Sequence, residues 1–172
     1  MMGAVHGYLA AHAPSWTVLR PSWFMENFSE QQHRVSIVEE NAIFSATGNG
    51  RVAFVSADDI AAVAAAVLTD PETPNGEMVL TGPSALSYDD VAQIISEVVG
   101  RRIVHRKLPV DALAERFRQL GLPADYAHTL ANMDGLLASG AEDRTTGVVS
   151  SVLGRLAIPF ERYAQSAKGA WM

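Results

Sequence analysis

One short stretch of this sequence fits a phosphate-binding pattern. Gly48, Gly50 and Ala53 match G-x-G-x-x-A, the turn whose backbone N–H groups hold the pyrophosphate of a dinucleotide. That chemistry requires the turn to open a helix, because the first N–H groups of the helix bind the anion. Residues 52–55 instead have the composition of a strand. We therefore predict a hairpin turn at 47–50, in which glycine supplies a positive φ.

Acidic and histidine side chains give weaker signals for chemistry. Asp58 and Asp59 could act as an acid–base pair, but carboxylates at a helix start also satisfy free N–H groups, and we predict this capping role. The five histidines have no metal-ligand spacing and the chain has no cysteine, so no metal site is predicted. A serine hydrolase remains an alternative, because Ser22 could meet His6 or His33 in space.

The most informative cluster of residues follows a predicted buried strand. Residues 16–19 are apolar and β-branched without alternation, as in a strand covered on both faces. The segment 21–28 then lies at the carboxyl end of that strand, where open α/β sheets bind ligands. Its aromatic, methionine and asparagine side chains are the usual mixture of a small-molecule site, although core packing is the alternative. The candidate ligand-binding residues are Trp23, Phe24, Met25 and Asn27.

The elements that position these residues alternate between strand and helix. Strands are predicted at 16–19, 42–46, 52–55, 77–81 and 103–108. Helices are predicted at 2–12, 59–68 and 87–99, with weaker helical segments between 23 and 40 and a helical region after Pro109. Ser56 or Asp58 caps the second helix, and Ser87 with Asp90 forms a capping box at the third. This order predicts an α/β fold with a parallel-leaning sheet.

Length and charge narrow the class of protein. The 172 residues are about one domain long, and the formal net charge of −6 argues against a nucleic-acid partner. No apolar run approaches a membrane span and no signal peptide is recognisable, so we expect a cytoplasmic protein without a membrane partner. The basic cluster within 101–107 is interpreted as an edge strand protected by charge, with a phosphate contact as the alternative.

The segment Trp16-Thr-Val-Leu-Arg-Pro-Ser-Trp-Phe-Met-Glu-Asn-Phe28 resembles T-x-L-R-P-x-x-F-M-x-N-F of the NmrA-like branch of the atypical short-chain dehydrogenases/reductases. The resemblance continues through 52–61, 80–88 and Ser139-Gly-Ala-Glu-Asp143. It is strongest to the ergot-alkaloid-biosynthesis-like and quinone-oxidoreductase-like subgroup, and it covers the C-terminal part of such proteins.

This resemblance implies the C-terminal portion of a Rossmann-type NAD(P)-binding fold. Residues 1–86 would carry the residual Rossmann-type strands and the substrate loop, and 87–172 a mostly helical substrate region of the same compact unit. The implied activity is NAD(P)-dependent reduction of a small carbonyl, quinone or imine, without the Gly-rich dinucleotide site. The resemblance names no catalytic residue. It places Pro21, Ser22, Trp23 and Phe24 beside the NAD or NADP cofactor, and Trp23, Phe24, Met25 and Asn27 beside the substrate.

Two other functions remain open, and one assembly is expected. Some NmrA-like proteins bind dinucleotides without turnover, so a non-catalytic ligand-binding or regulatory module is the first alternative. Cofactor-independent hydrolysis in an exposed pocket is the second. The strand at 16–19 would lie at an unpaired apolar sheet edge, which favours pairing with another chain, so we predict a homodimer or a larger homo-oligomer.

Overall fold

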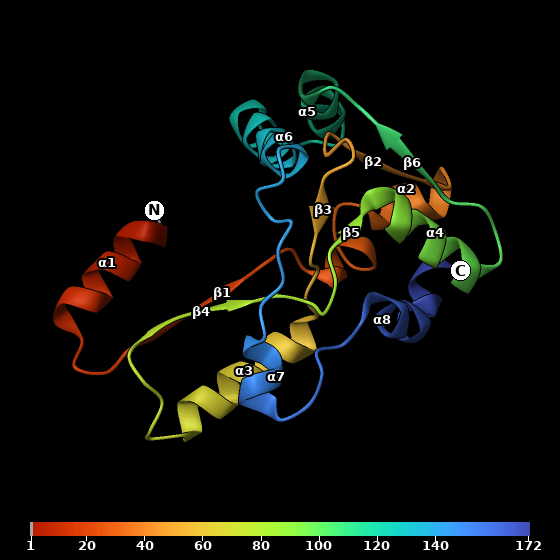
Figure 1. The fold of residues 1–172 in the computed structure, drawn as a ribbon. Coiled ribbons are helices and arrows are strands. Elements are labelled where there is room, and N and C mark those ends of the chain that lie inside the picture. The colour runs from red at the N-terminus through yellow and green to blue at the C-terminus, as the bar shows by residue number, and fades with distance from the viewer. Residues whose placement is uncertain (1) are drawn as a thin grey trace.

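The computed structural model describes residues 2–172 as a mixed α/β fold (Figure 1). The helices are α1 (Met2–His12), α2 (Arg34–Glu39), α3 (Ala57–Thr69), α4 (Tyr88–Val99), α5 (Val110–Gln119), α6 (Ala124–Ala138), α7 (Val148–Leu153) and α8 (Phe160–Ser166). The strands are β1 (Thr17–Pro21), β2 (Ala42–Ser45), β3 (Arg51–Val52), β4 (Gly76–Leu80), β5 (Leu86–Ser87) and β6 (Val104–Lys107). The 3-10 helices are η1 (Met25–Phe28) and η2 (Lys168–Trp171). The predicted fold class is confirmed.

The strands pair as three separate two-stranded ladders. β1 lies parallel to β4 with Leu19 opposite Met78, and β2 lies parallel to β6 with Ile43 opposite His105. β3 and β5 form a short antiparallel pair. Parallel pairing dominates, as the alternation of elements predicted.

The predicted hairpin at 47–50 is wrong. β2 and β3 flank this turn but do not pair with each other, because each pairs with a strand from later in the chain. The turn is fixed against α6 instead: a Cβ at Gly50 would lie 2.2 Å from the carbonyl oxygen of Leu137. Gly48 has the expected positive φ of 56°. The glycines therefore allow close approach to a helix rather than reversal of a β-ribbon.

Local capping signals are confirmed at two helices. Ser56 is the N-cap of α3, and its hydroxyl accepts a hydrogen bond from the Asp58 N–H at 3.2 Å. At α4 the Ser87 hydroxyl accepts from the Asp90 N–H at 3.1 Å, and the Asp90 carboxylate accepts from the Ser87 N–H at 2.9 Å. This is the predicted capping box, and it fixes where α4 leaves β5.

An aromatic cluster forms the centre of the largest core. Phe28 packs edge-on against Phe54, Tyr88 and Phe160, with ring centroids 5.2 to 5.6 Å apart. Trp171 is fully buried in the same cluster, and its indole N–H donates to the Phe28 carbonyl at 2.7 Å. This core draws residues from both 1–86 and 87–172.

Helix α1 projects away from the rest of the fold (Figure 1). Val5 is 51% exposed and Tyr8 is 65% exposed, although both are large and apolar. Its contacts with the body include the His6 ring, which lies 5.4 Å from the Trp16 ring and 3.8 Å from the Glu77 carboxylate. None of the described helices is both long and apolar enough to span a lipid bilayer.

Candidate functional site

The segment after β1 runs along the carboxyl ends of two parallel strands. The Ser22 N–H donates to the Leu80 carbonyl at 2.8 Å, which extends the β1–β4 ladder by one step. Trp23 and Met25 then bond to Val55 through their backbones, at 2.9 and 3.0 Å. The β1–β4 ladder and an isolated bridge to Val55 therefore hold this segment, at the edge where open α/β sheets bind ligands.

A cleft of about 460 Å³ opens beside this segment. Five of the residues predicted to bind cofactor or substrate line it together, and the structure adds a methionine from α6 and a glutamate from the loop that follows α6. Met25 lies elsewhere: its side chain is 1% exposed and belongs to the aromatic core. The lining residues are Pro21, Ser22, Trp23, Phe24, Asn27, Met133 and Glu142.

The two added residues come from a region that sequence reasoning did not connect with the cleft. Glu142 accepts a hydrogen bond from the Ser22 hydroxyl at 3.0 Å, across 120 positions of sequence. The loop that carries Glu142 is anchored by Thr146, whose hydroxyl donates to the Val79 carbonyl at 2.6 Å. The string 139–143, which carries part of the family resemblance, was the one available signal.

A buried carboxylic acid anchors α6 behind Met133. Asp134 is 6% exposed and accepts a hydrogen bond from the Ala46 N–H at 2.9 Å. Burial raises the pKa of Asp134 to about 6, and the bond from Ala46 opposes this shift. Asp134 therefore ties α6 to the turn after β2 and fixes the wall of the cleft formed by Met133.

The family of this chain follows from comparisons with known proteins. The model of the NmrA-like family matches residues 4–158. This chain belongs to the NmrA-like family. It is 41% identical over 171 residues to an uncharacterized oxidoreductase, YesF, of Bacillus subtilis (strain 168), covering 99% of this chain and 59% of that protein. It is also 41% identical to agroclavine dehydrogenase of Claviceps fusiformis, covering 99% of this chain and 60% of that enzyme. This NmrA-like chain thus spans about three-fifths of the length of these relatives.

Solved structures show the same fold. Triphenylmethane reductase of Citrobacter sp., complexed with NADP(H), superposes with a TM-score of 0.84 at 26% identity, over 95% of this chain and 57% of the reductase. An NADPH-dependent quinone oxidoreductase of Escherichia coli gives a TM-score of 0.86 at 23% identity, over 95% of this chain and 58% of that structure.

The dinucleotide phosphates do not fit the described part of this NmrA-like chain. The G-x-G-x-x-A string leads into β3 rather than a helix, and Gly50 packs against the α6 backbone. In the basic cluster, Arg101 donates to the carbonyls of Ile37 and Trp171 instead of facing an open site. The cleft beside Trp23 does fit a flat ring such as nicotinamide, because it has apolar walls at the ligand-binding edge of parallel strands.

The acidic pair at the start of α3 is divided between two roles. Asp58 lies in the first turn, as predicted for a residue at a helix start. Asp59 is fully buried and accepts from the Ile158 N–H at 2.7 Å, and it pairs with Arg155 at 2.7 Å. The prediction that Asp59 caps α3 is therefore incomplete, because its side chain also holds the C-terminal segment against that helix.

The predicted serine–histidine pairs do not form. Ser22 bonds to Glu142, while His6 lies beside Glu77. His33 is stacked on Phe28 with a centroid distance of 5.0 Å, and burial lowers its pKa to about 3. Neither imidazole ring is hydrogen-bonded to a serine hydroxyl in the described structure; the Ser36 hydroxyl donates only to the backbone carbonyl of His33.

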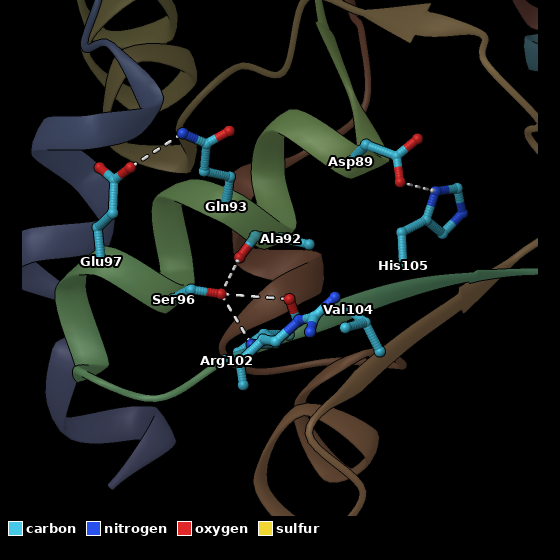
Figure 2. Close-up of a pocket in the computed structure, with 9 residues that line it drawn as sticks. Asp89, Ala92, Gln93, Ser96, Glu97, Arg102, Val104 and His105 are labelled. Atoms are coloured by element: carbon cyan, nitrogen blue, oxygen red, sulfur yellow. Dashed lines mark hydrogen bonds and ion pairs between the residues drawn. The ribbon is translucent and has the colours of Figure 1, made fainter.

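A different serine–histidine–aspartate alignment lies on the far side of the core. The Ser45 hydroxyl is 2.7 Å from His105 Nε2, and His105 Nδ1 is 3.3 Å from the Asp89 carboxylate, the contact drawn in Figure 2. The side chains of Ser45 and His105 have no exposed surface. A substrate therefore cannot reach the Ser45 oxygen. Sequence spacing gave no signal for this alignment, because its members lie on β2, β6 and α4.

Proposed function

We propose that this NmrA-like chain carries the substrate side of an NAD(P)H-dependent reductase that acts on a small carbonyl, quinone or imine. The observation that supports this function is the cleft at the carboxyl ends of β1 and β4, where Pro21, Ser22, Trp23, Phe24 and Asn27 meet. The relatives support the same reaction class, because their names include dehydrogenases and NADPH-dependent reductases.

The cofactor and the substrate share this cleft in the proposal. Pro21, at the end of β1, and Ser22, directly after it, contact the nicotinamide ring, and Trp23 and Phe24 contact both that ring and the substrate. NAD(P)H supplies a hydride when it is bound. Because the G-x-G-x-x-A string leads into β3 and not into a helix, the proposal assigns none of residues 2–172 to the pyrophosphate. Met25 supports the site from the core behind Trp23.

The residues of the cleft perform three tasks in this proposal. Phe24 is 38% exposed and Met133 is 41% exposed, so both offer apolar surface that a flat substrate covers on binding. Trp23 supplies a rigid aromatic wall. The Asn27 amide provides a hydrogen-bond donor that orients a polar atom of the substrate. Together they exclude water from the reacting atoms.

Tryptophan fluorescence tests the proposed site. The full chain is titrated with menadione, a small quinone, and with NADPH, while the emission is recorded. We expect both ligands to quench the emission, with the signal lost in Trp23→Phe and retained in the matched variant Trp16→Phe. Quenching that is unchanged in Trp23→Phe, or absent from the unmodified chain, would overturn the proposed site.

Measurement of NADPH oxidation distinguishes the reductase from a non-catalytic ligand-binding module and from a hydrolase. We expect the chain to oxidise NADPH only when menadione or an aldehyde is present. Binding of both ligands without NADPH oxidation would favour the non-catalytic ligand-binding module. Cleavage of a chromogenic ester without any cofactor would favour a hydrolase.

A further inference from the structure

We propose that the groove between α4 and β6 binds an acidic peptide segment of another protein, which adds as an extended strand to the free edge of β6. The groove has a volume of about 450 Å³, and Figure 2 shows the residues that line it. None of them belongs to the cleft at the end of β1, so this inference stands apart from the proposed reductase function.

One edge of β6 is unpaired. Within residues 2–172, β6 pairs with β2 and with no other strand. The Val104 N–H donates to the Asn41 carbonyl at 3.0 Å and so faces β2. Because the backbone groups of successive residues in a parallel strand point alternately to its two sides, those of His105 and Lys107 point away from β2. They form a row of donors and acceptors of the kind that pairs with an added strand.

A side chain of α4 already occupies the first position of this edge. The Ser96 hydroxyl oxygen accepts from the Ile103 N–H at 2.8 Å and lies 3.2 Å from the Ile103 carbonyl oxygen, the contacts drawn in Figure 2. Ile103 precedes His105 by two residues, so its backbone groups also face away from β2. Ser96 thus takes the place of a strand partner at Ile103. No backbone hydrogen bond of the described chain does the same for His105 or Lys107.

The length of the groove suits a short extended segment. Along α4 the groove runs from Asp89 to Glu97, and at 1.5 Å per residue this span is about 12 Å. An extended chain advances about 3.3 Å per residue, so three or four residues fill the groove. Ala92, Ile103 and Val104 in the lining offer apolar surface to small side chains of the segment.

Basic side chains without acidic partners flank the groove. Arg102 lines it and Arg106 lies in β6; both are exposed, and neither takes part in an ion pair within the described residues. Lys107 and Asp89 form an ion pair at 2.8 Å and so offset each other, and Glu97 is the remaining acidic residue of the lining. The whole chain carries −6, but exposed charges more than about 8 Å away are largely screened at physiological ionic strength. The local excess of arginine therefore favours a segment with carboxylate side chains.

The same charges exclude a second copy of this chain as the occupant. Two β6 edges brought together would place the arginines and Lys107 of one copy against those of the other, and like charges that face each other across strands are destabilising. Basic residues are also a usual protection of a sheet edge against self-association. The edge therefore rejects its own copy and accepts an acidic strand.

Hydrogen exchange at single amides tests this inference. The probe is a pentapeptide of alternating glutamate and valine with blocked ends, and the matched control peptide has lysine in place of glutamate. Each is added to the full chain, and amide exchange is followed by NMR. At saturation we expect the acidic peptide to slow exchange at His105 and Lys107 about tenfold and to leave Val104, which is already bonded to β2, unchanged. The lysine peptide should have no effect.

Two pairs of variants separate backbone pairing from charge. Lys107→Pro and Lys107→Ala both remove the ion pair with Asp89, but only Lys107→Pro removes the outward N–H. We therefore expect Lys107→Ala to retain binding of the acidic peptide and Lys107→Pro to lose it. Arg102→Gln should weaken binding about threefold. Arg20→Gln, which removes the same charge from an exposed position of β1, should leave binding unchanged.

Three results would each overturn the inference. They are exchange at His105 and Lys107 that the acidic peptide does not slow, equal effects of the acidic and the lysine peptide, and equal binding by Lys107→Pro and Lys107→Ala. Circular dichroism checks that the proline variant is folded; if it is not, the exchange measurement on the unmodified chain decides. None of these results bears on the reductase function, which the titrations with menadione and NADPH test.

Discussion

The Ser22 hydroxyl donates a hydrogen bond to the Glu142 carboxylate at 3.0 Å and so joins the end of β1 to the loop after α6. These residues are 120 positions apart in the sequence. The bond closes one side of the cleft and orients the charge within it. The cleft is therefore a product of tertiary structure, although most of its lining comes from one short segment.

Ser22→Ala should weaken both the fold and the binding of menadione. Loss of this bond leaves Glu142 without its partner, and we expect the free energy of unfolding to fall by about 1 kcal/mol. The affinity for menadione should fall as well, because the bond that joins the two sides of the cleft is lost. Urea unfolding and calorimetry measure the two effects. Ser151→Ala, at an exposed position of α7, is the control; equal behaviour of both variants would contradict the role of Ser22.

The capping box of α4 gives a prediction about stability alone. Ser87→Ala removes the acceptor for the Asp90 N–H, and we expect a loss of about 1 kcal/mol in the free energy of unfolding. Ser87→Thr keeps a hydroxyl at the N-cap and should retain most of the stability. Thermal unfolding followed by circular dichroism compares them. A Ser87→Ala variant as stable as the Ser87→Thr variant would show that the box does not stabilise α4.

The raised pKa of Asp134 predicts that the stability of the fold depends on pH. Its pKa is raised by burial to about 6 in the fold, so the folded state binds a proton more strongly than the unfolded chain does. The stabilising effect of protonation is full below about pH 4 and is lost as the pH rises through 6; the whole effect is on the order of 3 kcal/mol. Asp134→Asn keeps an acceptor for the Ala46 N–H and removes this titration.

The difference in the free energy of unfolding between the unmodified chain and the Asp134→Asn variant isolates the titration of Asp134. Burial lowers the pKa of His33 to about 3, so His33 makes stability rise with pH over part of the same range. Because His33 is present in both proteins, its effect cancels in the difference. Urea unfolding at intervals from pH 4 to 7 should show Asp134→Asn gaining stability relative to the unmodified chain as the pH rises. A stability difference that does not change with pH would contradict the raised pKa of Asp134.

Assembly is a separate prediction. In the described structure β1 pairs with β4 on one side only, and α1 exposes Val5 and Tyr8 nearby. Unpaired edges and exposed apolar side chains favour association, so we predict a homodimer or larger homo-oligomer. Light scattering at low micromolar concentration should give at least twice the chain mass, and Tyr8→Lys should lower it. A monomeric mass for the unmodified chain would disprove the prediction.

Local sequence signals predicted the local structure well. The capping box at Ser87, the N-cap at Ser56 and the end of α4 at Gly100, which has a φ of 72°, depend on residues within one helical turn. The position of segment 21–28 at the end of a strand was also predictable, because strand composition and the following proline identify that end. The family resemblance then supplied its role as a hypothesis.

Long-range contacts were not predictable from one sequence. The turn at 47–50 has the composition of a hairpin. Its flanking strands β2 and β3 pair with β6 and β5 instead of with each other, and α6 contacts Gly50. Met133 and Glu142 reach the cleft only because α6 and the loop after it fold back over β1. The alignment of Ser45 with His105 likewise depends on the register of two parallel strands. No local pattern encodes these pairings.

The most direct test of the proposed site is a crystal structure of the full chain with menadione bound. We expect the quinone ring to lie between Trp23, Phe24 and Met133. A ring bound elsewhere would contradict it, for example in the cleft of about 450 Å³ between α4 and β6 that Figure 2 shows.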